Sequence, residues 1–432
     1  TGMPRPQGRV RPSRIARVFV PQLDDYPAPA TPIVPWSRAI FDRISMELAR
    51  GCSEGCRFCE AGYTYRPLRD RRPAELVASA RTAIEATGYE ELSLCSLSPA
   101  DYPALEPLSA ILAHDMTRLG VSLSISSLRA YGVSAQVFAN LRSLRTAGLT
   151  LAPEAGTQRL RDVINKTVTE EDLLGAVTRA FGLGWQKVKL YFMIGLPTET
   201  DDDVLAIADL ARKVLATGRR WQRRAGVTAS VGVFVPRPHT PFQREGMAAP
   251  AVLAHRRDLL YDALRRSGVI LKFADERMSR RECALARGDR SLSRVILHAF
   301  RAGARFDNWG DLARHDLWDQ AFVAEGLDFD QACGPVPDGT DLPWEIIDPL
   351  VSRAFFEKER ERALQGEVRP ACEKPLAWAS EGPASLRDHP VVCYQCGVGC
   401  VPTDIRTARY AAFEQGSGLP LPKPVPEPVH SV

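Results

Sequence analysis

Short apolar runs alternate with amphipathic segments between residues 42 and 245 of this 432-residue chain. Runs rich in Leu, Ile and Val with polar or Gly borders are typical of buried parallel strands. We predict strands at Arg43–Leu48, Glu91–Ser96, Val121–Ser126, Leu149–Pro153, Lys187–Ile194 and Thr228–Val235. The segments between them repeat apolar residues at helical spacing and predict helices at Ala74–Ala86, Ala135–Ala147, Glu170–Phe181 and Asp203–Ala216. The pattern therefore indicates consecutive strand–helix units.

The spacing of these units predicts the fold class. Successive strand centres lie roughly 28 to 46 residues apart, which is the length of a parallel strand–helix crossover. Six such units favour an α/β fold, either a complete or partial (β/α) barrel or a doubly wound sheet. In both architectures functional side chains gather at the carboxyl ends of the strands.

The pattern changes on both sides of this region. Residues 1–41 are rich in Pro and Arg and are expected to form an extended basic arm. Residues 246–345 are expected to be mainly helical, with helices at His255–Arg266, Ser279–Ala286 and Leu292–Ala302. Residues 346–432 begin with a charged helix, Ile347–Leu364, and continue into a Cys-rich tail whose Pro-rich end, Pro420–Val432, is expected to be disordered.

Composition indicates a globular protein. Hydrophobic residues make up 45% of the chain and charged residues 25%, which excludes a fibrous or intrinsically disordered class. The net charge of +4 creates no global field that would commit the chain to nucleic acid or to a membrane. No run of about 18 apolar residues predicts a transmembrane helix, and the first residues lack the apolar segment of a secretory signal. We therefore expect a cytoplasmic protein without a membrane partner.

The ten cysteines include two groups that are close in sequence. In a large chain without a secretory signal, such groups bind metal more often than they form disulfides. The first group directly follows the first predicted strand, and the second lies in the tail. Their members are Cys52, Cys56 and Cys59, and Cys372, Cys393, Cys396 and Cys400.

The first group has the spacing Cys-x3-Cys-x2-Cys. Thiolates are the usual ligands of iron–sulfur clusters, and three of them can hold three irons of a [4Fe–4S] cube. No fourth Cys lies nearby, so the last iron would stay open for a non-protein ligand. A structural zinc site would need four closed ligands, and this loop offers no nearby His. We therefore predict that Cys52, Cys56 and Cys59 hold such a cluster and form the catalytic centre.

These cysteines, with the aromatic Phe58 directly before the third, resemble the cluster loop of the radical SAM superfamily. The resemblance covers residues 35–245. Within the superfamily the chain resembles a bacterial branch of cobalamin-binding-domain radical SAM proteins. Members of that branch usually carry a further N-terminal domain, which we do not expect here, so cobalamin binding is not implied. The segments that carry this resemblance are 50–67, 96–102, 152–157, 194–199 and 234–242.

The resemblance implies a partial (β/α)6 TIM-like barrel, followed by the helical extension and the Cys-rich tail. It also implies an activity. The open iron would bind the amino and carboxylate groups of S-adenosylmethionine (SAM), and an electron passed into the cluster would cleave SAM to a 5′-deoxyadenosyl radical that abstracts a substrate hydrogen. Such an enzyme needs an electron donor such as flavodoxin or ferredoxin. No motif identifies the substrate.

By the same resemblance, residues after the second and fourth strands are candidate SAM contacts, beside Phe58 in the cluster loop. Ser96 and Ser98 lie where the superfamily binds the methionine amino group, although hydroxyls there can equally satisfy local backbone groups. Glu154 can accept hydrogen bonds from the ribose hydroxyls or the amino group of SAM, and Arg159 can pair with its carboxylate. An internal salt bridge between Glu154 and an arginine is the alternative.

Residues after the last two strands are candidate contacts of the adenine. Ile194 and Gly195 follow the fifth strand, and Gly195 lets the backbone come close to a bound ring. Val235 ends the sixth strand. The apolar character of Ile194 and Val235 would equally suit a protein core.

The tail predicts a second metal centre. Cys393, Cys396 and Cys400 have the spacing Cys-x2-Cys-x3-Cys, and Cys372 precedes them as a fourth ligand. Four thiolates fit an auxiliary [4Fe–4S] cluster or tetrahedral zinc. We favour the cluster, because the chain already needs cluster assembly for its first site. Glycines at 397 and 399 would let the backbone wrap around the metal and donate N–H groups to sulfur.

Two other functions remain open at this stage. A methylthiotransferase-like modifier of RNA or protein also uses a second cluster, and Trp221 among the arginines of 219–224 would suit RNA. A solvated loop explains that basic segment more simply. The alternative from another class is a non-catalytic iron–sulfur electron carrier or a zinc-stabilised interaction protein. Formation of 5′-deoxyadenosine from SAM distinguishes the enzymes from the carrier.

Overall fold

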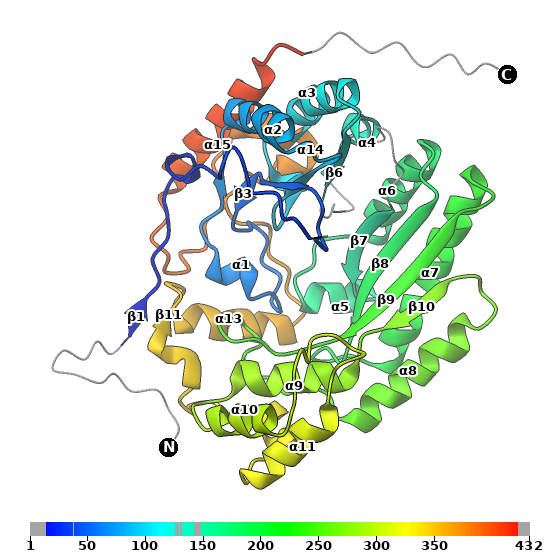
Figure 1. Cartoon of the computed structure of the whole chain (residues 1–432), viewed down its shortest axis with the longest axis vertical. Helices are drawn as coiled ribbons and strands as arrows, with labels where there is room; N and C mark the ends of the chain where they lie inside the picture. The colour runs from blue at the N-terminus through cyan, green and yellow to red at the C-terminus, as the bar shows by residue number, and fades with distance from the viewer. Residues whose placement is uncertain (1–13, 38, 126–128, 130–131, 142–147, 422–432) are drawn as a thin grey trace.

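The computed structural model describes residues 14–37, 39–125, 129, 132–141 and 148–421 (Figure 1). Two parallel sheets form its centre, and helices cover their outer faces. One sheet has the order β2-β5-β6, and the other has the order β10-β9-β8-β7. Among the described residues β6 and β7 are not paired, so the barrel is open between the sheets. The α/β fold with a partial barrel is confirmed.

The strands follow the predicted apolar runs closely. Their bounds are β2 (Ile44–Glu47), β5 (Glu91–Cys95), β6 (Ser122–Ile125), β7 (Leu149–Glu154), β8 (Lys187–Ile194), β9 (Gly226–Val233) and β10 (Ile270–Phe273). The sixth strand begins and ends two residues earlier than predicted. The sequence pattern missed β10, because it is only four residues long and lies at the sheet edge, where it pairs with β9 and buries none of its side chains fully.

Helices follow most of these strands. Their bounds are α2 (Pro73–Thr87), α3 (Leu105–Arg118), α4 (Ala135–Asn140), α5 (Gln158–Val163), α6 (Glu170–Gly182), α7 (Asp201–Trp221) and α8 (Pro250–Leu264). Two of them begin with reciprocal capping boxes, Thr169 with Asp172 and Thr200 with Asp203. The helix predicted at 135–147 ends at Asn140, and its residues 142–147 lie outside the described part.

The helical extension packs a small core of its own around Cys283, Val295, Trp318 and Phe322. Its helices are α9 (Glu276–Arg287), α10 (Leu292–Arg301), α11 (His315–Ala324) and α12 (Phe329–Cys333). The charged helix after it, α13 (Arg353–Leu364), begins six residues later than predicted. Pro349 interrupts the helical pattern, and Ser352 caps the helix by accepting from the backbone N–H of Phe355. The preceding Ile347–Asp348 forms β11, which pairs with β1 (Ile15–Ala16).

The tail folds back onto the first half of the barrel. It contains α14 (Trp378–Glu381) and α15 (Pro402–Ser417), and α15 lies against α2 and α3 (Figure 1). The remaining elements are β3 (Ala49–Arg50), β4 (Arg69–Asp70), α1 (Ala61–Thr64), η1 (Leu23–Asp25), η2 (Pro99–Asp101), η3 (Pro343–Ile346) and η4 (Gly382–Leu386). Of the predicted disordered end, Pro420–Val432, residues 422–432 lie outside the described part.

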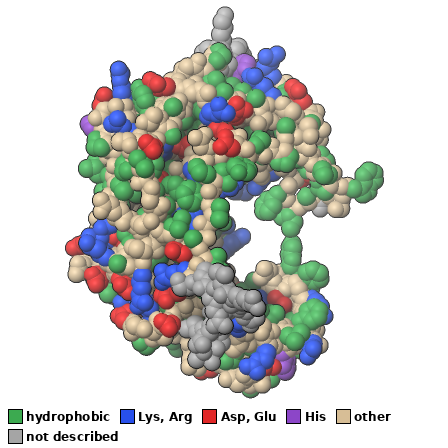
Figure 2. Space-filling view, turned by 90° about the vertical axis from the view of Figure 1, so that its left-hand side faces the viewer, with side chains coloured by type: hydrophobic (Ala, Val, Ile, Leu, Met, Phe, Trp, Pro, Cys, Tyr) green, Lys and Arg blue, Asp and Glu red, His purple; other side chains and the backbone are tan. Residues whose placement is uncertain are grey.

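The surface agrees with the balanced composition. Hydrophobic, basic and acidic side chains are interspersed over the face drawn in Figure 2. None of the helices in the described part of the chain combines the length and hydropathy that a bilayer-spanning segment needs.

Candidate active site and tail cysteine centre

The first cysteine group lies in a loop between β3 and α1. Gly51 opens the loop with φ of +100°, and a Cβ there would lie 2.7 Å from the carbonyl oxygens of Tyr65 and Pro67. Only glycine combines this backbone conformation with so close an approach. The chain therefore turns sharply at the end of the strand region and presents the three cysteines together.

The three thiols lie in a largely buried environment. Burial raises the pKa of Cys52 and of Cys56 to about 11. A guanidinium nitrogen of Arg129 lies 3.7 Å from the sulfur of Cys52. Buried thiols of this kind become thiolates when a metal replaces their protons. The loop thus has the chemistry of a metal site rather than that of a free reactive cysteine.

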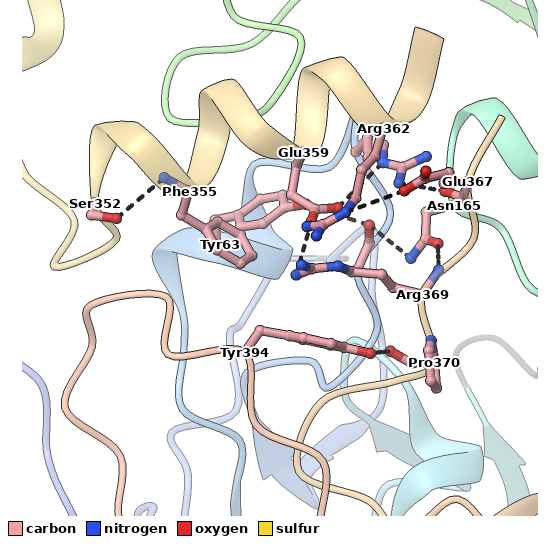
Figure 3. Close-up of polar contacts among 12 residues, drawn as sticks. Tyr63, Asn165, Ser352, Phe355, Glu359, Arg362, Glu367, Arg369, Pro370 and Tyr394 are labelled. Carbon is pink, nitrogen blue, oxygen red and sulfur yellow. Dashed lines mark hydrogen bonds and ion pairs between the residues drawn. The ribbon is translucent and has the colours of Figure 1, made fainter. Parts of the chain in front are cut away.

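The segment after α5 and the C-terminal part of the chain hold the cluster loop in place. Asn165 donates to the carbonyl oxygen of Gly55 (3.2 Å) and accepts from the backbone N–H of Arg369 (2.8 Å). The fully buried Arg57 donates to the carbonyl oxygens of Val163 (2.9 Å) and Glu367 (2.6 Å). Figure 3 shows how Asn165, Glu367 and Arg369 converge below α13.

A buried group of charges, which sequence reasoning missed, supports the same loop. Lys374 donates to the carboxylates of Glu54 (2.7 Å) and Asp101 (2.6 Å), and all three side chains are nearly inaccessible to solvent. Arg129 pairs with both carboxylates as well. Burial alone would raise the pKa values of Glu54 and Asp101, but the charges of Arg129 and Lys374 lower both. In the sequence, only their closeness to Cys52 and Cys372 could have identified Glu54 and Lys374 as residues of the site.

Glu154 ends β7 in the left-handed region, with φ of +69°, which is costly for a non-glycine residue and typical of functional sites. Its carboxylate lies 3.3 Å from the ammonium nitrogen of Lys166. Burial raises the pKa of Glu154, and Lys166 only partly offsets this. Lys166 is also largely buried and lies in the field of Cys56. The internal salt bridge is thus with a lysine that the sequence analysis did not single out.

The other candidate SAM contacts have different surroundings. Arg159 is half exposed and binds Thr198 and Asp203 at the start of α7. The hydroxyl oxygen of Ser96 is buried and has no hydrogen-bond partner among the described residues. The hydroxyl oxygen of Ser98 is likewise buried and has no hydrogen-bond partner among the described residues. Buried orphan hydroxyls fit an absent ligand in this place, so Ser96 and Ser98 have equal support as candidate contacts.

The predicted adenine contacts lie at the ends of β8 and β9. Gly195 has φ of +88°, and its N–H donates to the carboxylate of Glu199 (2.7 Å). Burial raises the pKa of Glu199 to about 7, although the Gly195 N–H and Arg256 counteract it. Ile194 is buried in the main core, and Val235 packs against the helical extension. Phe58 packs beside the residues of α5.

The four tail cysteines line one cavity of about 250 Å³, together with Arg66 and Glu373. Gly397 and Gly399, which also line the cavity, have φ of +112° and +79°, so the chain turns sharply there. No three Cys, His, Asp or Glu side chains of the described residues converge on one point as the ligands of a single ion do. The thiolates of an iron–sulfur cube bind separate irons and need no such convergence.

Comparison with known proteins identifies the central region. Residues 46–211 match the radical SAM superfamily, and this segment is a radical SAM domain. An uncharacterized protein of Methanocaldococcus jannaschii, MJ0966, is 34% identical over 289 residues, which are 66% of this chain. The chain spans about 60% of the length of that curated relative.

Several solved structures have a similar fold at low identity. SuiB of Streptococcus suis, bound to S-adenosylmethionine, is 12% identical with a TM-score of 0.38, over 54% of this chain and 50% of that one. HemN of Escherichia coli, described as a radical SAM enzyme, is 15% identical with a TM-score of 0.37, over 52% of each chain. The cobalamin-dependent enzyme OxsB is 11% identical with a TM-score of 0.39, over 86% of this chain and 58% of that one. Similarity at this level carries no argument about function.

Proposed function

We propose that this chain is a radical SAM enzyme in which Cys52, Cys56 and Cys59 hold a [4Fe–4S] cluster. The observation that carries the proposal is the Cys-x3-Cys-x2-Cys loop at the start of a radical SAM domain. When bound, the cluster supplies the electron that cleaves SAM to a 5′-deoxyadenosyl radical. The protein's part is to orient SAM and the substrate and to exclude water.

The residues around the loop match the charges of SAM. SAM has an amino group, a carboxylate and ribose hydroxyls, and these need acceptors and donors. Ser96, with its orphan hydroxyl, and Glu154 are proposed acceptors of N–H and O–H groups. Lys166 supplies a cation at the same strand end, and we assign it the carboxylate role beside Arg159, whose guanidinium already binds Asp203.

The remaining assignments concern the adenine and the overall organisation. We propose that Ile194, Gly195 and Val235 line the adenine, that Phe58 packs beside the cluster, and that Ser98 supports the amino-group subsite.

The proposed segments are the arm 1–41, the core 42–245, the helical extension 246–345 and the tail 346–432. From its motifs we also propose that the core belongs to the cobalamin-binding-domain branch of the superfamily. The electron donor is of the flavodoxin or ferredoxin type, and the substrate is of unidentified class.

We propose in addition that Cys372, Cys393, Cys396 and Cys400 hold a second [4Fe–4S] cluster. The common cavity and the two wrapping glycines support this proposal. Metal and sulfide analysis after anaerobic reconstitution tests it. About eight iron atoms per chain indicate two clusters, whereas about four iron and one zinc indicate a structural zinc site.

The enzyme proposal is tested by incubating the reconstituted full chain with SAM and dithionite. We expect 5′-deoxyadenosine to form, and we expect none from the variant with Ala at positions 52, 56 and 59. A variant with Ala at the four tail positions serves as the matched control for general loss of cysteines. SAM cleavage by the triple variant would refute the assignment, and a wild-type chain that binds clusters without cleaving SAM would favour the electron carrier.

A further inference from the structure

Arg66 is a buried arginine that the proposed chemistry has not used. It follows α1, and its side chain is almost inaccessible, with 3% of the residue exposed. Its Nε donates to the carbonyl oxygen of Gly62 (2.9 Å). The guanidinium carbon lies 4.7 Å from the ring centroid of Tyr63 and 5.7 Å from that of Phe355. Two aromatic rings and one hydrogen bond therefore hold the guanidinium in one orientation.

One end of the Arg66 guanidinium lacks a hydrogen-bond partner in the described part of the chain. Nη1 is buried and makes no hydrogen bond with any described residue. A buried charged donor without an acceptor is expensive, because it has lost its hydration and gained nothing in return. Buried polar groups are satisfied in the great majority of cases, so an orphan donor next to a cavity indicates an absent acceptor.

The cavity beside Arg66 is the one lined by the four tail cysteines. Glu373 also lines it; its Oε2 accepts from the backbone N–H of Leu68 (2.8 Å), and its Oε1 lies 4.0 Å from the sulfur of Cys400. Of the described residues around the cavity, Arg66 is the basic one. A cube ligated by four thiolates carries net negative charge and presents sulfur acceptors. Such a cluster would satisfy both the charge and the free N–H of Arg66.

We propose that Arg66 donates a hydrogen bond from its guanidinium to a sulfur of a tail [4Fe–4S] cluster and thereby raises the reduction potential of that cluster. The inference rests on the tail cluster proposed above. Hydrogen bonds to sulfur and nearby positive charge both favour the reduced, more negative state. Arg66 is a positioning and tuning residue in this role, and it anchors the tail cluster to Gly62, three residues after Cys59.

The test measures the potential of the tail cluster alone. The full chain with Ala at positions 52, 56 and 59 is reconstituted anaerobically and titrated with dithionite, and the reduced cluster is followed by EPR. We expect Arg66→Met to lower the ratio of reduced to oxidised cluster about tenfold at a fixed potential, which is about 59 mV for a one-electron couple. Arg66→Lys keeps the positive charge, so its reduction potential should stay close to that of the protein with Arg66.

Two controls make the result specific. Arg212→Met removes an exposed arginine of α7 and should leave the potential unchanged. In the Arg66-containing protein, pulsed EPR with ¹⁵N-labelled arginine should detect a nitrogen coupled to the reduced cluster, and this measurement does not depend on whether Arg66→Met folds.

The outcomes separate the two proposals. An unshifted potential, or the absence of the ¹⁵N coupling, overturns the role of Arg66 while the tail cluster stands. An intact chain that holds only about four iron, together with a triple variant that holds no iron and shows no EPR signal, overturns both the tail cluster and the role of Arg66. SAM cleavage by the intact chain, read independently, would still support the first cluster.

Discussion

The backbone N–H of Cys372 donates a 2.8 Å hydrogen bond to the carbonyl oxygen of Ser53. This bond ties the first tail cysteine to the residue that follows Cys52. Nearby, Lys374 reaches Glu54 across 320 residues of sequence. The tail is therefore packed onto the first cysteine loop through backbone and buried charged contacts.

The pairing of Lys374 gives a prediction about stability. Lys374→Met leaves Glu54 and Asp101 buried with Arg129 as their remaining ion-pair partner among the described residues, and we expect a loss of roughly 3–5 kcal/mol in the free energy of unfolding. Anaerobic urea denaturation measures it. The matched control is Lys213→Met, which removes an exposed ion pair with Glu170 and should cost less than about 1 kcal/mol. Equal costs for the two variants would contradict the role given to the buried pair.

Glu154→Gln separates SAM binding from internal pairing. The substitution keeps the shape of the side chain and removes its charge, so the SAM affinity should fall by roughly 1–3 kcal/mol while the cluster absorbance stays intact. Equilibrium dialysis with SAM measures the affinity, and Glu170→Gln, at an exposed ion pair on α6, is the control. Unchanged SAM binding with reduced thermal stability would show that Glu154 serves only the salt bridge with Lys166.

Glu199 predicts a pH dependence of stability. Its pKa in the folded chain is about 7, against about 4.3 for an exposed Glu. Between these values the folded state binds more protons than the unfolded state, so the contribution of Glu199 is present at low pH and is lost as pH rises through 7. The full loss amounts to roughly 3–4 kcal/mol.

The measurement compares Glu199→Gln with the parent chain by denaturation at pH 5 and pH 7.5. Gln keeps an acceptor for the N–H of Gly195 and cannot ionise, so the stability of the variant should change less between the two pH values. Parallel pH profiles of variant and parent would rule out Glu199 as the source.

Gly51 predicts a local steric effect on the first site. Gly51→Ala places a Cβ 2.7 Å from two carbonyl oxygens in the left-handed region, whereas Gly120→Ala, at φ of +72°, meets nothing within 4 Å. Gly120→Ala should cost only the conformational strain, roughly 1–2 kcal/mol. Gly51→Ala should cost more and should also lower the iron content of the first site. Thermal unfolding measures the loss of stability, and iron analysis measures the iron content of the first site. Equal effects of the two variants would contradict the steric role of the carbonyl oxygens beside Gly51.

Strands, helix caps and the first cysteine loop could be predicted from the sequence, because each of them depends on residues that are close together in the chain. The apolar run of β8 and the capping box at Thr169 depend on contacts within one strand or one turn. The Cys52–Cys59 loop is likewise continuous, so its spacing alone predicted the metal chemistry. The start of α13 was predicted wrongly, although Pro349 and Ser352 lie in the same segment.

Tertiary structure decided which distant residues surround these features. Lys166 meets Glu154, Lys374 meets Glu54 and Arg66 faces the tail cavity because separate segments fold against the loop. The sequence alone does not identify the partner of any of these three basic residues. The partner of a lysine or arginine is set only when the folded chain buries the side chain and removes its hydration. The sequence determined the spacing of the two cysteine groups, from which their metal chemistry is predicted, and the packing of the tail decided that they are neighbours.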